Sequence, residues 1–170
     1  MNLRKNIFIA LLVSMGVAIG YIESLIPLPI PVPGARLGLS NIIILTTLVL
    51  FGYKEGIMVA CLKSFLLMLV LGHVTSFFYS ITGGILSCLG MIFAIKYLVP
   101  KISNIGVSEI GSACHNIGQV LVAGLIIQNW KIITYLPFLL LLGIFTGFFV
   151  GLSTNYIVEV LEKHMIFLKR

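Results

Sequence analysis

The stretch Gly56-Ile-Met-Val-Ala-Cys-Leu-Lys-Ser-Phe-Leu-Leu-Met-Leu-Val-Leu-Gly72 decides the fold class of this chain. It is an apolar run long enough to cross most of a bilayer, and its one charged residue, Lys63, lies at its centre. A charge at the middle of a membrane helix costs roughly 2.5–3.5 kcal/mol on insertion scales. Chains tolerate that cost mainly where the charge faces a wet cavity, a partner charge or a ligand. The stretch therefore predicts a membrane helix that holds something polar inside the membrane.

The composition of the whole chain indicates the same class. Hydrophobic residues make up 59% of the 170 residues and charged residues 9%, whereas a soluble domain carries about 25% charged residues. The net charge of +6 does not indicate nucleic-acid binding, because the basic residues are scattered between apolar runs. We therefore expect an all-α integral membrane protein with a single transmembrane domain over residues 1–170.

Six transmembrane helices are expected, at about residues 7–26, 37–53, 56–72, 77–95, 107–127 and 136–158. With a cytoplasmic N-terminus, eight basic residues lie inside the cell, two lie outside, and Lys63 stays in the membrane. The inner residues are Arg4, Lys5, Lys54, Lys96, Lys101, Lys163, Lys169 and Arg170, and the outer ones are Arg36 and Lys131. The positive-inside rule then predicts a multi-pass protein of the cell membrane with both termini in the cytoplasm.

Small residues recur every four positions in two of the spans. They are Gly143, Gly147 and Gly151 in the last span, and Ala10, Ser14 and Ala18 in the first. Such stripes let helix backbones approach closely. Packing inside the chain explains both stripes, and docking of another membrane subunit is an alternative for the first; the sequence leaves both open.

The first and second spans are joined by Pro27-Leu-Pro-Ile-Pro-Val-Pro-Gly-Ala-Arg36. Alternating prolines fix φ and favour an extended path. On the outer side of the membrane, Pro29, Pro31, Pro33 and Gly34 would form a stiff lid over an outward-facing pocket. The alternative is a plain connector that rests among the lipid headgroups.

Two candidate binding groups come directly after this loop. Arg36 and Asn41 open the second span, and a helix N-terminus presents free N–H groups and a positive partial charge. This combination predicts an anion site, although Arg36 would also suit a lipid phosphate. Glu23 lies near the outer end of the first span, where it could pair with Arg36 or Lys63 or contact a cationic ligand group.

A polar stripe marks the fifth span. Helical spacing places Ser112, His115, Asn116 and Gln119 on one face, at a depth similar to that of Lys63. A polar stripe at this depth predicts a binding site, and hydrogen bonding between spans is the competing interpretation. Tyr79, near the outer end of the fourth span, would line the mouth of the same site.

The sequence predicts no metal, no cofactor and no catalytic centre. His115 has no second His or Cys at ligand spacing, and Cys61, Cys88 and Cys114 lie inside apolar segments as small filler. The chain contains no aspartate. It also lacks the nucleotide-binding G-x-x-x-x-G-K-[ST] loop and the G-x-S-x-G nucleophile turn.

Three segments carry a family resemblance that extends from about residue 7 to residue 151. They are Pro33-Gly-Ala-Arg-Leu-Gly-Leu-Ser-Asn41, Tyr79-Ser-Ile-Thr-Gly-Gly-Ile-Leu-Ser87, and Gly106-Val-Ser through His115-Asn-Ile-Gly-Gln119. They resemble the Gx transporter family, which is also called heptaprenyl diphosphate synthase component I. At the basic position of the third span, members of that family often have Arg where this chain has Lys63, which keeps the charge but loses a bidentate fork.

That family is similar to the substrate-binding (S) components of energy-coupling factor transporters. The resemblance implies six membrane helices and a small-molecule pocket that opens outward under the loop after the first helix. It also implies a transmembrane coupling subunit and two cytoplasmic ATPases as partners, with Ala10, Ser14 and Ala18 contacting the coupling subunit. With Arg36, Lys63 and Lys131 near the pocket, we expect an anionic or strongly hydrogen-bonding solute.

The synthase name implies a different function, which the residues do not favour. Prenyl chain elongation needs Mg²⁺ held by carboxylates that clamp a diphosphate, and a chain without aspartate and with five scattered glutamates cannot build that site. An accessory membrane subunit that anchors a prenyl synthase or a redox enzyme stays open as the second hypothesis. A stand-alone carrier is a third, although no inverted repeat supports it.

Overall fold

The computed structural model describes residues 3–26 and 36–165, and the regular structure of these residues is entirely helical. In chain order the elements are α1 (Leu3–Ser24), α2 (Asn41–Phe51), α3 (Tyr53–Leu71), α4 (Val74–Tyr97), α5 (Asn104–Ile127), the 3-10 helix η1 (Trp130–Tyr135) and α6 (Leu136–Met165). The described residues contain no strand, which confirms the all-α class.

Four segments are long and apolar enough to cross a membrane: α1, α4, α5 and the stretch Trp130–Lys163, which comprises η1 and most of α6. Their outer faces carry large apolar side chains, such as Leu11 on α1 and Phe145 on α6, which are more than half exposed. Soluble proteins rarely expose apolar surfaces of this extent. The fold is therefore that of a multi-pass membrane protein.

The second predicted span is shorter in the structure than in the prediction. Helix α2 begins at Asn41 instead of residue 37, because Gly38 has a φ of 83°, a left-handed conformation that interrupts a regular helix. It ends at Phe51, and Gly52, with a φ of 103°, turns the chain into α3. The 11 residues of α2 span about 16 Å, roughly half of the hydrocarbon core.

The remaining helices also differ from the predicted bounds at their ends. Helix α5 begins at Asn104 instead of residue 107, and α6 continues to Met165 instead of ending at residue 158. Helix α3 is long enough to cross but carries three charged residues, Lys54, Glu55 and Lys63. The sequence located the helices, and their termini depend on local turns that hydropathy does not detect.

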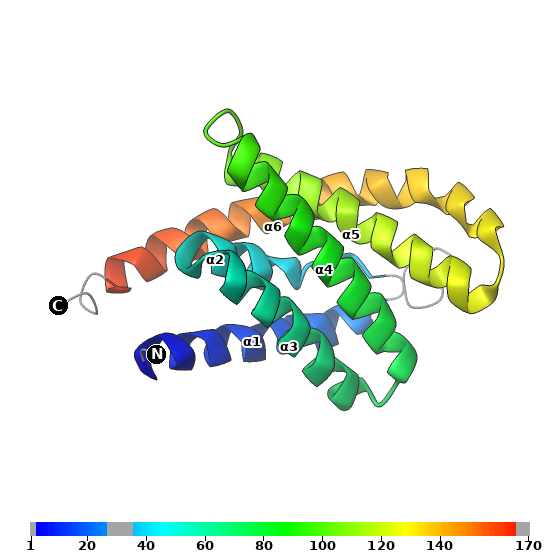
Figure 1. Ribbon diagram of the computed structural model, residues 1–170, viewed down its shortest axis with the longest axis horizontal. Helices are drawn as coiled ribbons and strands as arrows, with labels where there is room; N and C mark the ends of the chain where they lie inside the picture. The colour runs from blue at the N-terminus through cyan, green and yellow to red at the C-terminus, as the bar shows by residue number, and fades with distance from the viewer. Residues whose placement is uncertain (1–2, 27–35, 166–170) are drawn as a thin grey trace.

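Helix α2 lies at the centre of the bundle. It packs against each of the other five α-helices, whereas α1 contacts α2 and α3 but not α6. Figure 1 shows α2 between α1 and α6. Eight of the residues of α2 are buried, including Thr46 and Thr47. Burial on all sides explains why α2 has no polar face.

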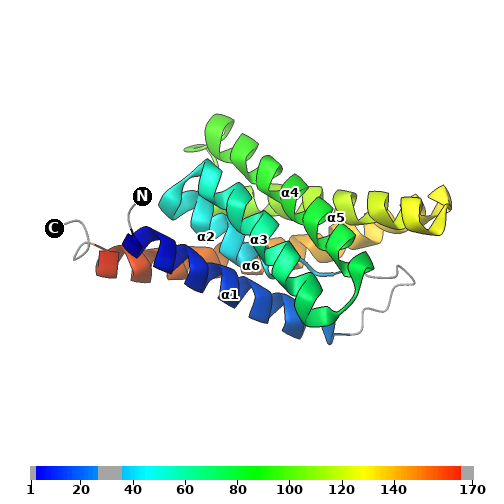
Figure 2. The same cartoon turned by 60° about the horizontal axis from the view of Figure 1, so that its bottom comes forward.

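The connections between helices fall at two ends of the molecule. The start of α1 and the end of α6 lie at one end, together with the α2–α3 and α4–α5 connections (Figure 1). The α3–α4 and α5–α6 connections lie toward the opposite end (Figure 2). This alternation is what successive crossings of one membrane require.

The glycine stripe of the last span packs against α5. A Cβ placed on Gly151 would lie 2.5 Å from the Cα of Ile105, and one on Gly147 would lie 2.9 Å from a carboxylate oxygen of Glu109. Ser108 Oγ donates a hydrogen bond to the carbonyl of Gly147 at 2.6 Å. The prediction that this stripe serves packing inside the chain is confirmed.

Candidate functional site

Lys63 does not face lipid. Its side chain is 1% exposed, and its aliphatic stem lies against Gly16 of α1, where an added Cβ would be 3.2 Å from Lys63 Cδ. Its Nζ donates a hydrogen bond to Ser40 Oγ at 2.9 Å. Helix α3 thus delivers the ammonium group to the start of α2, and the small residue at position 16 makes room for the stem.

The segment 36–41, between the proline loop and α2, is where the predicted site residues converge. The N–H of Arg36 donates to Gln119 Oε1 at 3.0 Å, which ties this segment to α5. The N–H of Gly38 donates to a carboxylate oxygen of Glu23, which ties it to α1. Two residues of one short segment therefore bind two distant helices through their backbone.

Gly38 also fits tightly against His115. A Cβ at Gly38 would lie 2.9 Å from His115 Cδ2 and 3.1 Å from Asn41 Nδ2. Gly38 also has a φ of 83°, which is a left-handed conformation. The position therefore favours glycine over any other residue, both for its backbone conformation and for the space available. The loop backbone, the imidazole ring and the Asn41 amide therefore form one packed unit.

The hydrogen bonds of Gln119 define the tautomer of His115. Gln119 Oε1 accepts from Arg36 and its Nε2 lies 2.8 Å from His115 Nε2. Because an amide nitrogen can only donate, His115 Nε2 must accept, and the neutral ring carries its proton on Nδ1. Nδ1 faces α4 at Gly83, where a Cβ would lie 2.7 Å away.

Glu23 is the single carboxylate among the described residues of this cluster. It is 4% exposed, and both Lys63 and Arg36 attract it electrostatically. Of the alternatives open for Glu23, a direct ion pair with either cation is not formed among the described residues, where the ion pairs are Lys5–Glu55 and Lys163–Glu159. Glu23 instead accepts the backbone N–H of Gly38, in the segment before α2, and its second oxygen has no hydrogen-bond partner there.

Three residues of the predicted site take part in other contacts. Asn116 Nδ2 donates to the carbonyl of Leu139 on α6 at 2.8 Å, so hydrogen bonding between spans explains this residue. Ser112 Oγ makes a similar bond to the carbonyl of Gly143 at 2.9 Å. Tyr79 is buried in an apolar cluster with Val120, Val122, Ala123, Ile132 and Leu139.

The other predicted positions are placed as follows. Ala10, Ser14 and Ala18 are all exposed on α1, on the side away from Gly16 and Gly20. Lys131 is exposed on η1 instead of joining the cluster. The lid residues Pro29, Pro31, Pro33 and Gly34 lie outside the described residues.

Sequence reasoning missed a pair of hydroxyl groups beside Lys63. Ser80 Oγ on α4 donates to Ser64 Oγ on α3 at 2.9 Å, and Ser64 Oγ donates to the carbonyl of Ala60 at 2.8 Å. Both serines are buried. The signal was the adjacency of Ser64 to Lys63 in an otherwise apolar run, which extends the polar character of α3 by one residue.

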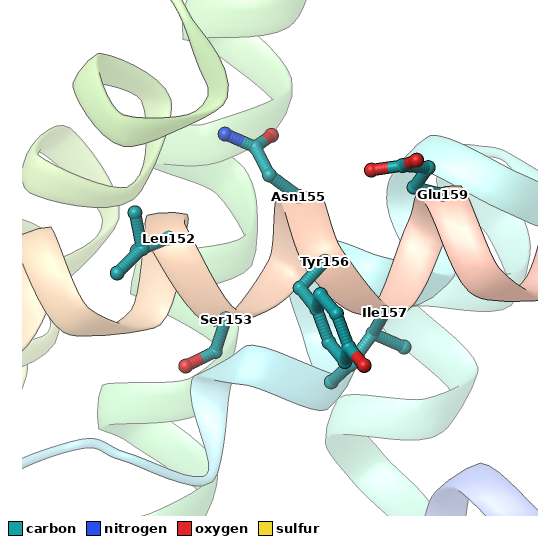
Figure 3. A pocket seen from close by; sticks show the side chains of 6 residues that line it. All are labelled: Leu152, Ser153, Asn155, Tyr156, Ile157 and Glu159. Atoms are coloured by element: carbon teal, nitrogen blue, oxygen red, sulfur yellow. The ribbon is translucent and has the colours of Figure 1, made fainter.

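A crevice with no room for a water molecule lies beside the cluster, and a larger depression lies elsewhere. The crevice is lined by Arg36, Leu37, Asn116, Leu139, Leu142, Gly143 and Thr146. The depression, of about 660 Å³, lies along α6 and is lined by Leu152, Ser153, Asn155, Tyr156, Ile157 and Glu159 (Figure 3). Asn155 accepts a hydrogen bond from Asn104, and Glu159 accepts one from Lys163, so the main polar groups of this depression already have partners.

The geometry of the cluster is suited to binding and not to metal chemistry. Within residues 3–26 and 36–165, no three His, Cys, Asp or Glu side chains are grouped so that they could hold a metal ion. The cluster contains an ammonium group, a guanidinium group, a carboxylate, an imidazole and amides from four helices and one loop. These groups can form charge-assisted hydrogen bonds with a small polar molecule.

A family model described as heptaprenyl diphosphate synthase component I matches residues 12–157. The chain belongs to this family. The match includes Glu23, Lys63, His115 and Gln119, and it confirms the resemblance found in the sequence. The family name describes one component of a synthase, and this is consistent with a non-catalytic subunit. No curated protein and no solved structure matches the chain.

Proposed function

We propose that this protein is the substrate-binding membrane subunit of an ATP-driven uptake transporter of the energy-coupling factor type. It captures a small organic solute, anionic or strongly hydrogen-bonding, from outside the cell. The buried charged cluster around residues 36–41 is the observation that carries this proposal. A bundle that needed only to pack would bury apolar residues there, since each buried charge costs several kcal/mol unless it is compensated.

The site residues have distinct roles in this proposal. Lys63 and Arg36 attract the anionic part of the solute, while Asn41, His115 and Gln119 orient it through hydrogen bonds. Asn116 and Tyr79 define the wall toward α6 and the outer apolar cluster.

The proposed topology has six membrane crossings with both termini in the cytoplasm of the cell. Helices α2 and α3 join the four long apolar segments, since α2 is buried inside the bundle and α3 carries only Lys63 in its middle. The grouping of the described chain ends at one end of the molecule supports an even number of crossings (Figure 1). Reporter fusions at the α3–α4 and α5–α6 connections test this topology, because both should be extracellular.

The proposed partners are a transmembrane coupling subunit and cytoplasmic ATPases. The exposed small residues Ala10, Ser14 and Ala18 on α1 are a surface on which another helix can pack closely. The chain has no nucleotide-binding loop of its own, so the energy for release into the cell would come from these subunits. Replacing Ser14 with Leu should abolish co-purification of the coupling subunit without loss of solute binding.

The decisive experiment is native mass spectrometry of the protein purified in detergent, which identifies any solute that leaves with it. We expect a small molecule in the wild-type protein and none in Lys63→Met. Lys54→Met is the matched control, because Lys54 is an exposed lysine on the same helix. Retention of the same molecule by Lys63→Met would reject the proposed site.

A second candidate function is a non-catalytic accessory subunit linked to polyprenyl diphosphate or quinone metabolism. The family description, which names a component of a synthase, favours it. Co-purification separates the two functions: a coupling subunit with ATPases supports transport, whereas a soluble prenyl synthase with no bound solute supports the accessory role.

A further inference from the structure

The buried cluster contains an unequal number of positive and negative charges. Lys63, Arg36 and Glu23 are 1%, 8% and 4% exposed, respectively. With ordinary protonation they sum to one positive charge. An uncompensated charge inside a membrane protein is costly. One negative charge brought by a ligand would balance it, and two would leave an excess of negative charge.

Glu23 is fixed in place and cannot move away from the cluster without a structural cost. One of its oxygens accepts the N–H of Gly38. Gly38 in turn packs against His115, and the neighbouring Ser40 accepts a hydrogen bond from Lys63. The Glu23 side chain is therefore held in place beside the segment that leads into α2.

Two buried hydrogen-bond acceptors beside the start of α2 have no partner among the described residues, and neither has the Nδ1 donor of His115. The acceptors decide what a ligand must donate. They are the second carboxylate oxygen of Glu23 and Asn41 Oδ1, both on side chains that are at least nine-tenths buried. Both atoms accept hydrogen bonds. A ligand that satisfies them must carry N–H or O–H donors close to its anionic group.

We infer that Glu23 makes this site selective for singly charged anions that carry a hydrogen-bond donor beside the charge. The inference rests on the proposed binding function and narrows its substrate class. Lys63 and Arg36 together would attract a doubly charged anion strongly, and Glu23 opposes the second negative charge. Glu23 is thus a specificity-determining residue, and the lysine and arginine supply the affinity.

Sulfamate and sulfate test the charge preference, because both are tetrahedral sulfur oxyanions and they differ by one charge. Sulfamate also carries N–H donors beside its charge, as the inferred ligand does. The measurement is the anion concentration that gives half of the maximal rise in Tm of the detergent-purified protein, at constant ionic strength. The response of Lys63→Met, which lacks the binding charge, is subtracted to remove general salt effects. We expect the wild-type protein to prefer sulfamate.

Glu23→Gln should shift the ratio of the two half-maximal concentrations toward sulfate by about tenfold or more. The substitution removes one negative charge, and the repulsion between that charge and the second charge of sulfate acts in a medium of effective dielectric constant about 20. Glu23→Asp should keep the wild-type preference. Glu55→Gln is the control, because Glu55 is a carboxylate bonded to Lys5 outside the cluster. If Glu23→Gln does not fold, Arg36→Gln replaces it. Arg36 is bonded to Gln119 through its backbone N–H, so this variant keeps that hydrogen bond. It should lose the specific response to both anions.

A preference of the wild-type protein for sulfate, no specific response to either anion, or an unchanged ratio in Glu23→Gln would overturn the inference. Native mass spectrometry separates this failure from failure of the proposed function. A neutral or doubly charged solute that is retained in a Lys63-dependent manner would overturn the inference and leave solute binding intact. A protein that retains no solute and co-purifies with a synthase would overturn both.

Discussion

Replacement of Gly38 by Ala tests the central claim that the loop backbone docks onto His115. The backbone has a φ of 83° at this position, and alanine in a left-handed conformation costs about 1–2 kcal/mol. The new Cβ would also lie 2.9 Å from His115 Cδ2, which no relaxed side chain tolerates. The ring must move, and its hydrogen bond with Gln119, worth about 1 kcal/mol, is lost. The expected loss of stability is about 2–3 kcal/mol.

Gly72→Ala is the matched control. Gly72 ends α3 with a φ of 71°, and a Cβ there would have nothing within 4 Å. This variant carries the conformational cost alone, about 1–2 kcal/mol. The difference between the two variants therefore isolates the contact with His115.

Thermal unfolding in detergent measures both variants, with the fluorescence of Trp130, the single tryptophan of the chain, as the signal. Gly38→Ala should have the lower Tm and should lose the stabilisation by sulfamate, which Gly72→Ala keeps. Equal losses of stability in the two variants, or an unchanged anion response in Gly38→Ala, would refute the docking of this segment on α5.

Three further predictions follow from the same contacts. Lys63→Met should raise the Tm of the ligand-free protein, because it removes a buried charge and leaves the cluster neutral; a lower Tm would mean that the ammonium group stabilises the fold. Gly151→Ala should destabilise the protein by about 1–3 kcal/mol, because its Cβ would lie 2.5 Å from the Cα of Ile105 and force α5 and α6 apart; thermal unfolding measures this effect. Glu55→Gln should lower stability by less than about 1 kcal/mol in the same assay, because the Lys5–Glu55 pair is partly exposed, and a larger loss would show that it anchors α1.

The membrane class, the helices and several polar residues that the structure gathers in the buried cluster could be predicted because they depend on local patterns. Lys63 stands out as one charge in an apolar run, and His115 and Gln119 stand out as polar residues on one helical face. The glycine stripe of α6 repeats every four residues, so its packing role could also be predicted. Each of these signals needs only a short window of sequence.

The partners of these residues could not be predicted, because they are distant in sequence. Lys63 donates to a serine 23 positions away, and the backbone of Arg36 meets Gln119 across 83 positions. No periodicity links such segments. The partner of Asn116 could not be predicted either. Asn116 shares a helical face with His115, but its side chain donates to the carbonyl of Leu139 on α6. Spacing identifies a face of a helix but not which residues on that face remain available to a ligand.

The way in which segment 36–41 is held explains how one short stretch can serve both folding and binding. Its links to α1 and α5 use the N–H groups of Gly38 and Arg36, and these groups would be present whatever the side chains were. The guanidinium of Arg36 lines the crevice, and the amide oxygen of Asn41 has no partner among the described residues. Structure at this junction therefore depends mainly on the backbone path, which requires glycine at position 38. In the proposed function, the side chains of Arg36 and Asn41 are then left to recognise the solute, so a change of solute within the family would alter them before it altered Gly38.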